Sequence, residues 1–180
     1  EAWINPYDGQ HSGHIFFDGD DTPEHDQLIR YLHGKIDVHN YFIPSWGVES
    51  PTPIPARMWT HIAVVFNRNR ISIYQNGFLT ATKDGDVRCH QSTSRVAIGS
   101  GVHHGRPYHA QFYGKMTNVK VWRRALSVDE ILRSMRNQTM NTEGLLGHWT
   151  FSNGYRSTEP NRSLKPVAYG LVSLEPIKTE

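Results

Sequence analysis

Residues 58–77 constrain the fold most strongly, because they predict a β-hairpin with a buried first strand. Residues 60–66 are β-branched or apolar at almost every position, which is typical of a strand covered on both faces. After a polar turn, residues 71–74 alternate apolar and polar side chains, as a strand half open to solvent does. Asn76-Gly77 predicts a type I′ turn, since both residues tolerate positive φ. With residues 78–82 as the return strand, this segment predicts the middle of a β-sandwich.

Most of the remaining chain predicts further short strands separated by loops. The predicted strands are residues 1–5, 14–17, 27–32, 35–43, 95–99 and 145–151, and residues 111–122 are predicted as one long or two short strands. His33-Gly34 is the expected turn between two of them. Met116 is out of phase with the apolar residues that follow it, which a bulge would explain. Residues 44–55 contain four prolines and predict an extended connection without regular structure.

A single helix is predicted in the C-terminal half of the chain. The sequence from Ser127 to Glu130 is a capping box, in which the two side chains satisfy each other's backbone amides. The helix is expected to run to about Asn137 and to pack on the edge of the sandwich. Its predicted apolar stripe is Val128, Ile131, Leu132 and Met135. This pattern indicates a structural role.

Several blocks of sequence resemble laminin-G-like domains, which belong to the concanavalin A-like jelly rolls and have the pentraxins as relatives. The sequences WTHIA at 59–63 and IYQNG at 73–77 resemble the W-x-H-x-A and L-Y-x-[ND]-G core of that family. The blocks at 1–6, 114–127 and 144–151 fit the family pattern in the same order.

The resemblance implies an all-β fold, namely a two-sheet antiparallel jelly-roll sandwich with one short α-helix. It implies a domain over residues 1–154, with the family's first strand expected ahead of Glu1 in a longer protein. Residues 155–180 are then a terminal strand or a linker to a further domain. The resemblance also places His61 as a hydrogen-bonded core residue. Trp59, Trp122 and Trp149 are expected in the core as well.

The functions found in this family are glycan binding, protein adhesion and non-catalytic support of enzymes, and fold alone does not select among them. The resemblance therefore implies a non-catalytic module that recognises a glycan or a protein surface. The alternative is an accessory structural domain packed within a larger multidomain enzyme or scaffold. Jelly-roll glycosidases carry an E-x-D-x-x-E strand, because retaining hydrolysis needs two carboxylates close together, and the sequence holds no such triplet. We therefore expect no catalysis in this segment.

An acidic segment at residues 18–26 is the candidate metal site. It holds five carboxylates, and carboxylate oxygens with a glycine for a tight bend suit calcium. Asp18, Asp20 and Asp26 are the predicted ligands, so calcium is the candidate cofactor. A solvated acidic loop explains the same composition equally well.

The candidate ligand contacts lie in two other segments. Residues 103–109 are rich in histidine, and in this fold such a loop lies at an end of the sandwich, where ligand contacts are common. His104, Arg106 and Tyr108 are the predicted contacts there, with an exposed loop of no function as the alternative. Trp46 lies in the proline-rich connection and is the tryptophan expected to stack on a sugar.

Composition limits the partners and favours a location. The net charge of +2 does not favour nucleic acid or an anionic membrane, and no apolar run approaches the length of a membrane span. The only cysteine is Cys89, so the domain has no disulfide of its own, and cytoplasmic proteins also look like this. Asn137 and Asn161 begin glycosylation sequons. We expect an extracellular or cell-surface domain whose partners are a glycan or protein ligand and other domains of the same chain.

Overall fold

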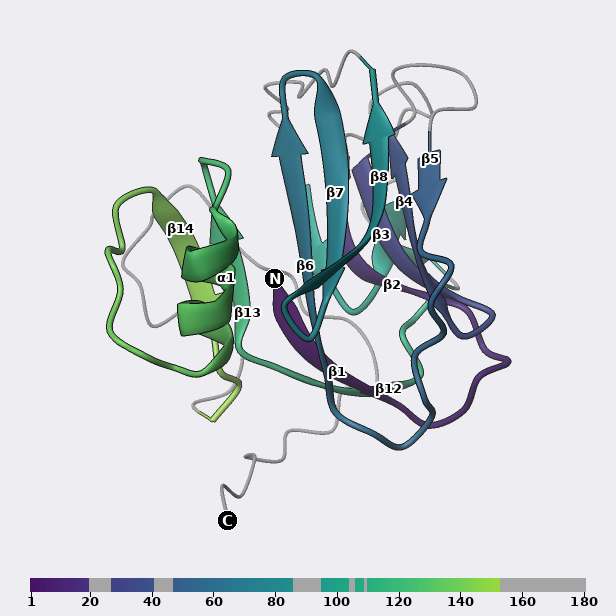
Figure 1. Ribbon diagram of the computed structural model, residues 1–180. Helices are drawn as coiled ribbons and strands as arrows, with labels where there is room; N and C mark the ends of the chain where they lie inside the picture. Colours follow the sequence, from purple (N-terminus) through teal and green to yellow (C-terminus); the bar gives the residue numbers. More distant parts are fainter. Residues whose placement is uncertain (20–26, 41–46, 86–94, 104–105, 109, 153–180) are drawn as a thin grey trace.

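The computed structural model describes residues 1–19, 27–40, 47–85, 95–103, 106–108 and 110–152. These residues form a sandwich of two five-stranded antiparallel sheets (Figure 1). Sheet A has the strand order β12-β1-β6-β7-β8, and sheet B has the order β5-β4-β3-β2-β9. With one short helix beside the sheets, the predicted jelly-roll class is confirmed.

The strands of both sheets are short, as the sequence predicts. Those of sheet A are β12 (Gly114–Thr117), β1 (Ala2–Pro6), β6 (Thr60–Asn67), β7 (Arg70–Gln75) and β8 (Phe78–Asp84). Those of sheet B are β5 (Gly47–Glu49), β4 (Lys35–Asn40), β3 (Gln27–Leu32), β2 (Gly13–Gly19) and β9 (Arg95–Ile98).

The predicted hairpin forms the centre of sheet A. Strands β6 and β7 pair from Ile62–Gln75 to Asn67–Arg70. Asn76 and Gly77 both have positive φ, at 50° and 81°, as a type I′ turn requires. The β7 strand is more buried than its alternation predicts, because Ser72 on its outer side is also buried.

The core lies between the two sheets. Its fully buried members come from both layers and include Ile4, Ile36, Val38, Ile71, Ile73 and Met116. Alternation along each strand brings these side chains to one face, so burial of that face fixes the register of each strand.

A smaller unit lies beside sheet A. It consists of β13 (Val119–Trp122), β14 (Leu145–Trp149) and the helix α1 (Val128–Met135) (Figure 1). The chain leaves sheet A at Asn118, whose φ of 49° interrupts the strand between β12 and β13. The prediction of two short strands within residues 111–122 is therefore confirmed, whereas the bulge predicted near Met116 is wrong. The irregularity is a break two residues later, which lets β13 pair with β14 instead of continuing in sheet A.

The helix begins as predicted. Glu130 Oε2 accepts from the Ser127 amide at 2.8 Å, and Ser127 Oγ accepts from the Glu130 amide at 3.3 Å. The predicted apolar stripe is wrong in part, because Val128 is 45% exposed while Ser134 is buried. The buried face of the helix turns toward Ser134, since that hydroxyl donates to Glu1 and accepts from Lys120.

Polar groups join the helical unit to sheet A. His61 is buried, with Nε2 3.3 Å from Glu1 Oε2, so its predicted burial is confirmed. Its side chain lies on the outer side of sheet A, against the helical unit, because Ile62 is the neighbour that enters the core. Trp149 is fully buried as predicted, whereas Trp59 and Trp122 are only half-buried.

Two predicted loops contain short strands. The proline-rich residues 44–55 include β5, and the histidine-rich residues 100–110 include the hairpin of β10 (Gly101–His103) and β11 (Arg106–Tyr108). Pairing with neighbouring strands, and not local preference, explains both. The close pairing of β5 with β4 requires glycine at position 47, because a Cβ atom there would lie 2.9 Å from the Val38 carbonyl oxygen. Among the described residues, no helix has the length and apolar character to span a membrane.

Candidate functional site

The outer face of sheet B is the candidate site. Phe16, Ile29, Val38 and Val48 lie opposite one another across four strands and pack against the core. Because successive side chains of a strand point to opposite faces, the residues flanking Ile29, Val38 and Val48 point away from the core. On β2 a register shift between His14 and Phe16 interrupts this alternation, and Ile15 lies in the core.

A row of polar side chains crosses this outer face. His14, Arg30, Asp37 and Glu49 lie opposite one another on β2, β3, β4 and β5. We call these four residues the polar row. Four charged or hydrogen-bonding groups are thus placed side by side on adjacent strands by the register of the sheet.

Ion pairs hold the polar row in place. Asp37 is buried, and its Oδ2 accepts from Arg30 Nε at 2.8 Å and lies 2.6 Å from Arg30 Nη2. The other oxygen, Oδ1, lies 3.2 Å from His39 Nε2. Beside them, Lys35 Nζ lies 2.7 Å from Glu49 Oε1. The Arg30 side chain is still 23% exposed, and a guanidinium has five N–H groups, so it can bind a further acceptor.

One end of the same face is apolar. Phe17, Leu28 and Ala97 form a small buried cluster there. The His14 ring stacks on Phe17, with ring centroids 6.1 Å apart and planes within 8°. Gly101 of β10 lies directly over His14, since a Cβ atom at Gly101 would come within 2.8 Å of the imidazole Cε1. The β10–β11 hairpin therefore borders the polar row on the β2 side.

The His14 imidazole is neutral at pH 7. Its burial, together with the Arg30 charge, lowers the pKa of His14 to about 4. Its Nδ1 atom has no hydrogen-bond partner in the described part of the chain. A neutral ring beside Arg30 adds no charge repulsion to the row.

Two of the predicted ligand contacts belong to the bordering hairpin. Arg106 and Tyr108 lie in β11, where their backbones pair with His103 and Gly101. Because Gly101 covers His14, the backbone of this hairpin lies next to the polar row. The predicted contact His104 lies outside the described residues, and ligand binding by all three stays a prediction.

Of the other predicted site residues, only Asp18 belongs to the described part of the chain. Asp18 lies near the end of β2, opposite Gln27 and Val96. Asp20, Asp26 and Trp46 lie outside the described residues. Gln27 pairs with Asn40, and His39 pairs with Gly47. The described residues that flank segments 20–26 and 41–46 therefore lie at the same end of sheet B as Asp18. Within the described ranges no group of three His, Cys, Asp or Glu side chains is placed to hold a metal ion. The calcium site stays a prediction.

Sequence reasoning missed the polar row itself. The signal for it lies in the turn at His33-Gly34, where φ is 48° and 83°. A two-residue turn fixes the register of the hairpin, so counting outward from it pairs Arg30 with Asp37. The pairing of β2 and β5 with this hairpin is not local, and no turn in the sequence indicates it.

The sequence matches a laminin G family model, whose description is the concanavalin A-like lectin/glucanases superfamily, over residues 1–132. The chain therefore belongs to this family. A search of curated proteins found no match.

Solved structures show the same fold at low sequence identity. A putative carbohydrate binding protein from Bacteroides ovatus is 18% identical with a TM-score of 0.64, over 83% of this chain and 44% of its own. The CBM40 domain of a Ruminococcus gnavus sialidase, bound to α2,3-sialyllactose, is 17% identical with a TM-score of 0.60, over 73% and 77%. A pentraxin from Limulus polyphemus is 18% identical with a TM-score of 0.57, over 76% and 69%.

Proposed function

We propose that this domain is a non-catalytic glycan-binding module and that the polar row is its binding surface. The observation that carries the proposal is the fixed array of Arg30, Asp37, His39 and Glu49 on one sheet face. Sugar hydroxyls need donors and acceptors in fixed positions, and pre-organised groups lose little conformational entropy on binding. The β10–β11 hairpin, with Arg106 and Tyr108, borders this surface and supplies a second side for a ligand.

The similar structures support the same proposal. One is a CBM40 domain bound to sialyllactose, and another is a putative carbohydrate binding protein. Binding modules of this kind act without catalysis. The ion pairs also argue against a catalytic role for the row, because Arg30 and His39 occupy both oxygens of Asp37.

A glycan array tests the proposal. The labelled domain is applied as wild type, as the double variant His39→Gln with Glu49→Gln, and as a control with Arg70→Gln and Asp84→Asn. The control removes an exposed ion pair of sheet A, with Arg70 Nε 2.6 Å from Asp84 Oδ1. We expect the wild type and the control to bind the same glycans, and the double variant to lose at least tenfold in signal. No binding across the array, or equal binding by all three proteins, would contradict the proposal.

A second candidate function, packing against other domains of a larger protein, is favoured by an apolar surface. At the start of β8, Phe78 is 76% exposed and Leu79 is 54% exposed. These residues follow the turn that contacts α1, through Gly77 and Leu132. Exposed apolar side chains that lie next to each other on the surface mark an interaction site. Replacement of both by serine is expected to leave glycan binding unchanged and to weaken only the association with flanking domains.

Calcium assistance and an extracellular location belong to the same proposal. Asp18, Asp20 and Asp26 are the proposed ligands. A metal that binds only the folded state raises its melting temperature. We therefore expect calcium to raise the Tm and EDTA to reverse the rise; no change with either would remove calcium from the account.

A further inference from the structure

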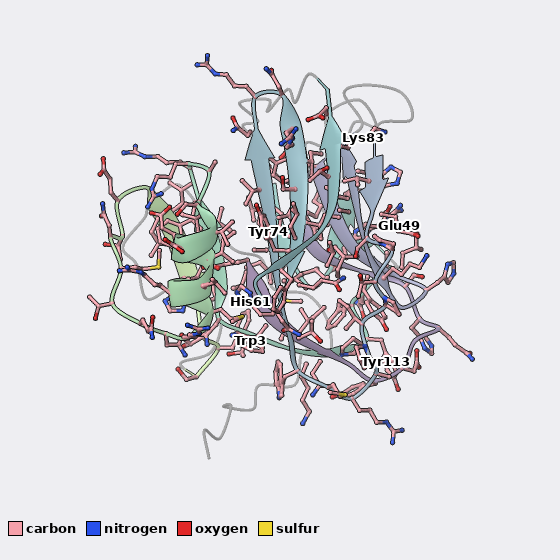
Figure 2. All side chains as sticks on the ribbon, in the orientation of Figure 1. Trp3, Glu49, His61, Tyr74, Lys83 and Tyr113 are labelled. Carbon is pink, nitrogen blue, oxygen red and sulfur yellow. The ribbon has the colours of Figure 1, made fainter. Side chains whose placement is uncertain are left out.

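An aromatic cluster lies at the opposite end of the sandwich from Asp18. Tyr7 follows β1, His11 precedes β2, and Tyr113 precedes β12. We call these three side chains the Tyr113 platform. Figure 2 shows Tyr113 at the lower end of the sandwich, away from the labelled Glu49 and Lys83. The platform shares no residue with the polar row.

The three rings support one another through defined contacts. Tyr7 meets Tyr113 edge to face, with centroids 5.0 Å apart and planes at 83°. The His11 ring lies 4.6 Å from the Tyr113 ring at 40°. These contacts fix the orientation of Tyr113, yet its side chain remains 45% exposed. An oriented aromatic ring is thus presented to solvent.

The backbone beneath Tyr113 is held closely on both sides. At Gly114, a Cβ atom would come within 2.5 Å of the Asn5 carbonyl oxygen and 2.8 Å of the Phe112 ring. The Tyr113 carbonyl accepts from the Tyr7 amide at 3.1 Å, and the Phe112 amide donates to the Gly99 carbonyl at 2.9 Å. Phe112 is buried in the core, so the alternation of the chain directs Tyr113 outward.

Polar groups surround the platform. Asp8 Oδ1 accepts from the amides of Gln10 and His11, each at 2.9 Å, and Asp8 Oδ2 lies 2.6 Å from His11 Nδ1. The backbone hydrogen bonds from His11 and Gln10 lower the pKa of Asp8, so it is ionised at neutral pH. Arg57 donates its amide to the Pro6 carbonyl at 2.6 Å and its Nε to the Tyr7 carbonyl at 3.5 Å.

We propose that the Tyr113 platform is a second carbohydrate site, which stacks on the C–H face of a neutral hexopyranose. The tyrosine ring supplies the apolar surface that such a face needs, and an exposed ring held by neighbours loses little entropy on stacking. Asp8, beside His11, and Arg57, beside the Tyr7 carbonyl, supply an acceptor and donors for the hydroxyls. The platform contains no free anion or cation cluster that would favour an acidic sugar.

A second site on the same domain has a consequence for avidity. Two weak sites on one rigid domain bind a branched or surface-bound glycan more tightly than either site binds a single sugar, provided that both are reached together. The platform would then act with the polar row without any contact between them.

The test is an NMR titration of the isotope-labelled domain with methyl β-D-galactopyranoside. A single stacking contact corresponds to a Kd on the order of millimolar or weaker, so the titration extends well into the millimolar range. We expect amide shifts at Tyr7, His11, Tyr113 and Gly114 in the wild type and in Tyr113→Phe, which keeps the ring. Tyr113→Ala is expected to lose these shifts at least tenfold. The matched control is Tyr74→Ala, which removes a half-buried tyrosine from sheet A.

Each outcome of the titration decides the proposal. Absence of shifts around Tyr113 in the folded wild type, or shifts that persist unchanged in Tyr113→Ala, would overturn it. Shifts confined to Arg30 and His39 would support the polar row and reject the platform. Shifts at the platform with a silent polar row would support the platform and leave the polar row to be decided by the glycan array, so the two proposals fail separately.

Discussion

At the residue scale, His14 shows how a titratable group is made part of a binding face. The ring lies between Phe17 and Gly101 and beside Arg30, and this burial keeps it neutral. A neutral ring fills the space between the apolar cluster and the charged half of the face. Protonation would place a second cation next to Arg30.

The depressed pKa of His14 predicts a loss of stability in mild acid. Its pKa is 6.5 in the unfolded chain and about 4 in the folded one. Between these values the unfolded state binds more protons, so the free energy of unfolding falls as the pH drops from about 6.5 to 4. At about 1.4 kcal/mol per unit of pKa, His14 contributes at most on the order of 3 kcal/mol to this loss.

Urea unfolding at pH 7, 5.5 and 4.5 measures the effect. Burial and the Lys120 charge also lower the pKa of His148 to about 4, so the wild type carries more than one such group. We expect His14→Asn to be less stable at pH 7 but to lose less stability on acidification than the wild type. Parallel pH curves for the two proteins would show that His14 does not titrate in this way.

At the element scale, tight turns with positive φ set both the register and the helix contact. Gly34 and Gly77 have nearly equal φ values, 83° and 81°. They differ in their surroundings: the nearest atom to a Cβ at Gly34 is the Gly9 carbonyl oxygen at 3.6 Å, whereas a Cβ at Gly77 would collide with Leu132 of α1. The two glycines therefore separate backbone strain from the cost of displacing the helix.

Replacement of each glycine by alanine is expected to destabilise the domain by different amounts. Gly34→Ala adds only the strain of a left-handed residue, about 1 to 2 kcal/mol. Gly77→Ala adds that strain and also the displacement of Leu132, so we expect a total of about 2 to 4 kcal/mol. Chemical denaturation of both variants measures the difference. Equal losses would mean that α1 yields without cost at this contact.

The elements that the sequence predicts are specified by local signals, whereas the elements that it misses depend on pairing between strands. The hairpins at Asn76-Gly77 and His33-Gly34 and the capped helix carry local signals, so their position follows from the sequence. The three-residue strands β5, β10 and β11 lie among prolines, glycines and histidines. β5 exists through pairing with β4, and β10 and β11 exist through pairing with each other. The polar row depends on one local hairpin and two distant pairings, which explains why its residues were not selected in advance.

At the scale of the whole molecule, a buried polar junction joins the helical unit to the sandwich. Lys120 Nζ lies 2.7 Å from Ser134 Oγ and 3.8 Å from Glu1 Oε1, and His61 approaches the other Glu1 oxygen. The junction links β13, α1, β1 and β6. Removal of one partner from a buried charged group leaves the rest unpaired, which costs far more than loss of an exposed ion pair.

Lys120→Met is therefore expected to destabilise the domain by about 2 to 4 kcal/mol. Lys35→Met, a matched loss of an exposed lysine paired with Glu49, is expected to cost less than about 1 kcal/mol. Thermal unfolding of both variants gives the comparison. A Tm for Lys120→Met as high as that of Lys35→Met would show that apolar packing alone holds the helical unit in place.

The most direct test of the central claim is an amide-shift map of the labelled domain with the strongest ligand from the glycan array. The account predicts shifts on the outer face of sheet B, at Arg30, Asp37, His39 and Glu49, and their loss in the His39→Gln, Glu49→Gln variant. Shifts confined to sheet A or to the helical unit, with sheet B unchanged, would contradict it.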